Sequence, residues 1–118
     1  MNFNEYQEAI KAFSVYPGHQ DINDDIVPYS SMMYPALGLA EEAGEVCGKI
    51  AKAIRKNDAY PSQEERTRIA LELGDVLFMV ARLASHINYN LEAIAGGNVG
   101  KLLVRKENGK IVGEGDIR

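Results

Sequence analysis

Two stretches decide the fold: Gly38-Leu-Ala-Glu-Glu-Ala-Gly-Glu-Val46 and, after a gap, Leu71-Glu-Leu-Gly-Asp-Val-Leu77. Apolar residues surround the acids in both stretches, as on the packed side of an amphipathic helix. Each stretch also carries acids three residues apart, and residues at that spacing share one face of a helix. The two stretches therefore predict two helices, each with an acidic pair on or beside its buried face.

The acids of these stretches are the candidate site residues Glu41, Glu42, Glu45, Glu72 and Asp75. A carboxylate among apolar neighbours is costly to bury unless a positive charge compensates it. With no histidine or cysteine among them, the five offer only hard oxygen ligands, which favours magnesium or manganese over zinc or iron. A lone Glu-x-x-Glu pair is usually surface decoration. Two acidic pairs on separate helices instead predict a metal site.

Length and composition predict one globular domain over residues 1–118, with 46% hydrophobic and 25% charged residues. The net charge of −4 argues against binding of a nucleic-acid polymer. The single Cys47 excludes an intramolecular disulfide and fits a reducing cytosol. No signal segment and no run of about eighteen apolar residues appears, so we expect a soluble, cytoplasmic protein without a membrane partner.

Apolar spacing, caps and turn residues predict an all-α, four-helix-bundle-like fold. The first helix is followed by a long connection over residues 14–31, and Ser62 with Glu65 forms a capping box at the start of the third. After the fourth helix, Asn108-Gly109 predicts a turn leading to a short hairpin or extended tail. The expected helices run from about Asn4 to Phe13, from Tyr34 or Pro35 to Arg55, from Ser62 to Asn88, and from Asn90 to about Lys106.

Glycines inside the helices need an explanation, because each costs about 1 kcal/mol relative to alanine. We interpret Gly38, Gly44 and Gly48 as positions where a neighbouring helix approaches closely. Gly96-Gly97 predicts a kink or a break in the fourth helix.

The acid pattern, Glu-Glu-x-x-Glu followed by Glu-x-x-Asp, resembles that of the MazG-like, all-α nucleoside triphosphate pyrophosphohydrolases. Asn98-x-x-Lys101-Leu-x-x-Arg105 is similar to that family's phosphate-binding segment, and Gly113-Glu-Gly-Asp-Ile-Arg118 to the ending of its short phage-type and bacterial members. The resemblance covers most of the chain from about Tyr34 onward. By itself, a lysine and an arginine one turn apart suit a polyphosphate, although a solvated basic stripe would look the same.

The resemblance implies hydrolysis of a nucleoside triphosphate to the monophosphate and pyrophosphate. It implies that Glu41 orients or deprotonates the attacking water. It implies that Mg²⁺ (or Mn²⁺) is held by Glu42, Glu45, Glu72 and Asp75. It also implies that the triphosphate is held by Asn98, Lys101 and Arg105.

Three questions stay open from the sequence. The substrate could be another pyrophosphate such as phosphoribosyl-ATP, or the chain could be a non-catalytic helical dimerisation module. Lys49 and Arg68 have two interpretations: surface salt bridges, with Glu45 and Glu72 respectively, or contacts to phosphate. Four helices of this size expose apolar stripes, so we expect a homodimer or a dimer of dimers, with site residues drawn from two chains.

Overall fold

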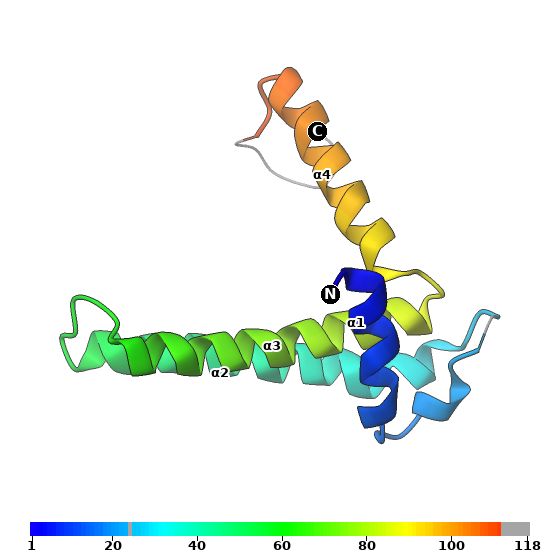
Figure 1. Ribbon diagram of the computed structural model, residues 1–118, viewed down its shortest axis with the longest axis horizontal. Coiled ribbons are helices and arrows are strands. Elements are labelled where there is room, and N and C mark those ends of the chain that lie inside the picture. The colour runs from blue at the N-terminus through cyan, green and yellow to red at the C-terminus, as the bar shows by residue number, and fades with distance from the viewer. Residues whose placement is uncertain (24, 112–118) are drawn as a thin grey trace.

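The computed structural model describes residues 1–23 and 25–111, which are helical without a strand (Figure 1). The predicted all-α class is confirmed. Three short 3-10 helices lie between or beside the longer elements, at Ile10–Phe13, His19–Asp21 and Tyr29–Met32. The four α-helices are α1 (Phe3–Ala9), α2 (Met33–Arg55), α3 (Gln63–His86) and α4 (Leu91–Glu107).

Helices α2 and α3 lie side by side and antiparallel along most of their length, forming a long helical hairpin (Figure 1). Pro35 lies in the first turn of α2, where its missing N–H is no loss. The capping box at the start of α3 is confirmed: Glu65 N donates to Ser62 Oγ at 3.1 Å, and Ser62 N donates to Glu65 Oε1 at 3.0 Å. Local sequence therefore sets the start of α3.

Three glycines of α2 are predicted to mark a close approach of a neighbouring helix, and the structure shows such an approach at Gly38. A Cβ atom built on Gly38 would lie 2.7 Å from the Sδ and Cε atoms of Met79 on α3. The same atom built on Gly44 or Gly48 would meet nothing within 4 Å. The prediction of close approach is therefore right for Gly38 and wrong for Gly44 and Gly48 within one chain.

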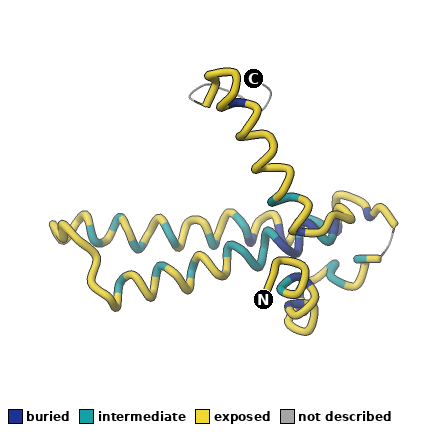
Figure 2. Tube along the Cα trace, turned by 45° about the horizontal axis from the view of Figure 1, so that its top comes forward, coloured by how far each residue is buried: buried dark blue, intermediate teal, exposed yellow. Residues whose placement is uncertain are grey.

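The buried core lies at the open end of the hairpin, where α1 crosses it (Figure 2). Ile10, Ala81 and Leu91 form its centre. Beside them Gln7 of α1 is buried, and its Nε2 donates to Ser85 Oγ at 3.0 Å. Its Oε1 accepts from the backbone N of Leu91 at 2.7 Å. One side chain thereby ties α1 to the end of α3 and to the start of α4.

Helix α4 begins as predicted, with Asn90 Oδ1 accepting from Ala93 N at 2.7 Å. It then runs unbroken through Gly96-Gly97, so the expected break does not occur. The helix contacts α1 and the end of α3 and then points away from the hairpin, as Figures 1 and 2 both show. Most of its length is consequently exposed.

The turn predicted at Asn108-Gly109 is present, with Gly109 at a φ of 66°. The hairpin or tail expected beyond it, including the Gly113–Arg118 ending, lies outside the described residues. No helix in the described part of the chain is both long enough and apolar enough to cross a lipid bilayer.

Candidate metal site

Three carboxylates meet across the helical hairpin. Glu42 of α2, Glu72 and Asp75 of α3 each place an oxygen within 4.8 Å of an oxygen of the other two. We refer to these three residues as the acid group. The structure thus brings together three of the four predicted metal ligands. The fourth, Glu45, lies outside the group and is exposed, as is Glu41 beside Glu42.

The acid group lies one turn from the tight contact between Gly38 of α2 and Met79 of α3. Glu42 follows Gly38 by four residues, and Asp75 precedes Met79 by four. Because residues four apart lie on one face of a helix, the acids continue the same contacting faces. The lack of a side chain at Gly38 lets the helices come together there. The backbone thereby places acids from both helices within reach of a single cation.

Burial and the surrounding negative charges both affect the pKa of Glu42. The pKa of Glu42 is raised above its usual 4.5 first by burial, and then by the negative charges of Asp75, Glu41, Glu72 and Glu45. Each cause disfavours the ionised form. All four other candidate acids therefore act on this carboxylate, including the two outside the acid group. A divalent cation would relieve the repulsion between them.

The acids are less enclosed than the sequence predicted. Asp75 is exposed, and its neighbour Leu71, expected on a buried face, is 67% exposed. The predicted position of the acids on or beside a buried face is therefore wrong for Asp75 in a single chain. Two helices cover only one side of each other, so the other side of the hairpin stays open to solvent.

Two basic residues beside the acids have partners that the sequence did not indicate. The Nζ atom of Lys49 lies 3.3 Å from Oε1 of Glu72, across the hairpin, and does not pair with Glu45. Arg68 pairs with Glu64, one turn before it on α3, and not with Glu72. Arg68 is therefore an ordinary surface pair, whereas Lys49 contacts the acid group.

The predicted phosphate-binding residues lie on α4, which leaves the hairpin (Figure 1). Asn98 and Lys101 are exposed, whereas Arg105 is buried with 6% exposure. One chain by itself does not bring these residues to the acid group. Contact between them would require a second chain.

Residues 32–109 match the family of the MazG nucleotide pyrophosphohydrolase domain. The chain belongs to this family. The matched segment holds α2, α3 and α4 and thus all eight predicted site residues. The MazG chain is also similar to the Gene 37 protein of Mycobacterium phage L5, at 36% identity over 118 residues, with all of both chains covered. No solved structure matches it.

Membership of the MazG family confirms the resemblance found in the sequence and supports a nucleotide pyrophosphohydrolase activity in general. The family typically depends on a divalent metal, and the acid group of this MazG chain could bind one. The donor set fits such an ion, because it is made of carboxylate oxygens drawn from two helices.

Proposed function

We propose that this protein hydrolyses nucleoside triphosphates, with ribose or deoxyribose, to the monophosphate and pyrophosphate. We propose Mg²⁺ as the ion, with Mn²⁺ as a substitute, and removal of unwanted nucleotides from the cytoplasmic pool as the role. The observation that carries the proposal is the meeting of Glu42, Glu72 and Asp75 within 4.8 Å in a MazG domain.

The residues present fit a hard divalent cation. Their oxygens suit magnesium or manganese. The pKa of Glu42 is raised first by burial and then by repulsion from the neighbouring acids, and a cation would counter that repulsion. When bound, the ion would neutralise charge on the phosphates and acidify a water molecule. We assign its binding to the acid group, with Glu45 contributing from the next turn of α2.

Glu41 is the proposed residue that orients or deprotonates the attacking water. It is exposed and adjacent to Glu42, whose pKa its negative charge helps to raise, so it lies close to the acid group. As neighbours on a helix, the two side chains point about a quarter-turn apart. Glu41 is thereby left free to accept a proton while Glu42 binds the ion.

A second copy of the chain completes the proposed site. Leu37, Ile54 and Leu71 on the hairpin are each 67% exposed, and Val99 and Leu103 on α4 are more than half exposed. Exposed apolar area of this extent marks a surface that another chain covers.

In such a homodimer, or in a dimer of dimers, α4 of one chain would lie over the hairpin of the other. Lys101, with Asn98 one turn before it, would then face the triphosphate held at the partner's acids. Arg105 is buried, so its predicted contact with phosphate would require that the side chain be uncovered.

The experiment is a screen for pyrophosphate release from canonical and damaged nucleoside triphosphates with Mg²⁺, with phosphoribosyl-ATP as the competing substrate. We expect release from at least one triphosphate by the wild type and none by Glu42→Gln, whose circular dichroism should stay helical. Equal activity of the two proteins would refute the assigned site. Release from phosphoribosyl-ATP alone would replace the proposed substrate, and no release at all would favour a non-catalytic module.

A further inference from the structure

The side chain of Lys49 contacts the acid group from α2. Its side chain is 34% exposed and reaches from α2 across to Glu72 on α3, whose side chain is 19% exposed. On α2, Lys49 follows Glu42 by seven residues, two turns along the same face. The ammonium group therefore lies at the edge of the acid group, against an oxygen of one of its three members.

No other cation reaches these acids within the described part of the chain. The remaining ion pairs between described residues join Lys11 to Glu8 and Arg68 to Glu64, away from the acid group. A single ammonium supplies one positive charge to three carboxylates and leaves most of the repulsion in place. It is thus a weaker partner than a divalent cation, and the two would compete for Glu72.

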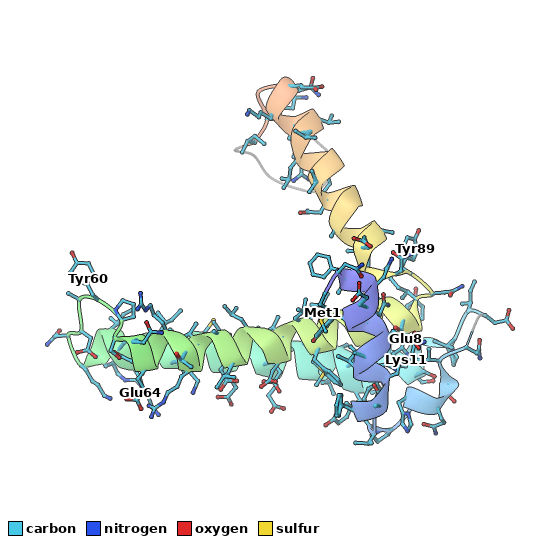
Figure 3. The ribbon with its side chains drawn as sticks, in the orientation of Figure 1. Met1, Glu8, Lys11, Tyr60, Glu64 and Tyr89 are labelled. Atoms are coloured by element: carbon cyan, nitrogen blue, oxygen red, sulfur yellow. The ribbon has the colours of Figure 1, made fainter. Side chains whose placement is uncertain are left out.

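Lys49 also has space to move away from Glu72. Its side chain lines a cavity of about 750 Å³ at the loop end of the hairpin, together with Lys52, Ile54 and Tyr60. Figure 3 shows Tyr60 at this end of the molecule. A lysine carries its charge on a flexible four-carbon stem. The stem can follow the apolar wall of the cavity while the ammonium group stays in water.

We propose that Lys49 is a built-in counter-ion of the acid group, which pairs with Glu72 while no metal is bound and turns into the cavity when a divalent cation takes its place. Lys49 is therefore a positioning residue: it keeps the crowded acids together in the metal-free protein, at the expense of metal affinity. This inference rests on the proposed function only in taking the acid group as the metal site.

The test compares Lys49→Met with Lys52→Met, a control that removes the same charge from the same cavity without breaking an ion pair. Calorimetric titration with Mn²⁺ should show about tenfold tighter binding by Lys49→Met, since removing a contacting positive charge is worth about that much. Lys52→Met and the charge-retaining Lys49→Arg should bind like the wild type. Without metal, Lys49→Met should melt below Lys52→Met, and with saturating Mn²⁺ this gap should close.

Unchanged or weaker Mn²⁺ binding by Lys49→Met would overturn the inference while leaving the metal site intact. Equal tightening by Lys52→Met would also overturn it, because the effect would then be one of general charge. If the wild type binds no Mn²⁺, the metal assignment in the proposed function is refuted. The melting of the metal-free variants would then decide the counter-ion role, and equal melting temperatures would refute it.

Discussion

The hydroxyl oxygen of Tyr16 lies 2.7 Å from Nε2 of His86, so the connection between α1 and α2 is fastened to the last turn of α3. Arg82 Nε donates to the same hydroxyl oxygen at 3.4 Å, so two side chains of α3 converge on Tyr16. The ring of Tyr16 stacks on that of Tyr34 at 5.3 Å, at the start of α2. These contacts hold the open end of the hairpin together.

The burial of His86 makes stability depend on pH. Burial, and then the charge of Arg82, lowers the pKa of His86 below 6.5, against a smaller opposing effect of Asp21. Between the lowered folded pKa and 6.5, the unfolded chain binds the proton more tightly, so protonation favours unfolding. The melting temperature should therefore fall as pH decreases through this range. Thermal melts between pH 7.5 and 5 measure it.

The matched variant is His86→Gln, which keeps a polar side chain but does not titrate. Both proteins should carry Glu42→Gln, so that titration of the acid group does not contribute in the same range. The decrease in melting temperature should be smaller in the His86→Gln protein. If both proteins lose stability in parallel, another group is responsible.

The contact of Gly38 with Met79 predicts a difference between two glycines of one helix. Gly38→Val should lower the free energy of unfolding by about 1–3 kcal/mol, because the added methyl groups must displace Met79. Gly48→Val is the control, with no atom within 4 Å, and should change stability by less than about 0.5 kcal/mol. Urea denaturation measures both. Similar losses would mean that the α2–α3 contact is not tight at Gly38.

Neutralising Glu42 should stabilise the metal-free protein even though we expect it to abolish turnover. Because the folded pKa of Glu42 is raised above 4.5, ionisation of this residue disfavours the folded state, and stability is lost as pH rises through that range. At pH 7 with chelator, Glu42→Gln should melt above the wild type, whereas excess Mg²⁺ should stabilise the wild type more. Glu45→Gln, outside the acid group, should give a smaller rise. A lower melting temperature for Glu42→Gln in chelator would contradict the repulsion.

The helices could be predicted from sequence because their signals are local. Ser62 and Asn90 cap α3 and α4 where the pattern places them. Three of the five candidate acids, Glu42, Glu72 and Asp75, do meet across two helices, since spacing fixes which residues share a face.

The sequence could not predict the contacts and the burial that depend on how the helices pack against one another. The spacing of four makes Glu45 one possible partner of Lys49, beside a phosphate, but the antiparallel register of the hairpin brings Lys49 to Glu72. The apolar residues around Asp75 predict a buried face, but Asp75 and Leu71 are both exposed in one chain. The buried contact of Tyr16 with His86 joins residues 70 positions apart, which no local pattern reveals.

The direction of α4 predicts that each site is shared between two chains. The acids lie on the hairpin, whereas Lys101 lies on a helix that points away from it (Figure 1). If Lys101 of one chain serves the acids of the other, Glu42→Gln and Lys101→Ala should each be defective alone. A mixed dimer of the two variants would hold one site with both residues intact.

The measurement is pyrophosphate release after the two variants are mixed, unfolded and refolded together. Random pairing of two chains should restore about a quarter of the wild-type sites, because half of the dimers are mixed and each has one intact site. A mixture of Glu42→Gln with Asp75→Asn is the control and should stay inactive, since both changes fall on acids of the same hairpin. If the Lys101→Ala mixture also stays inactive although native mass spectrometry shows mixed dimers, Lys101 must act on its own chain, and α4 would then have to fold back over the hairpin.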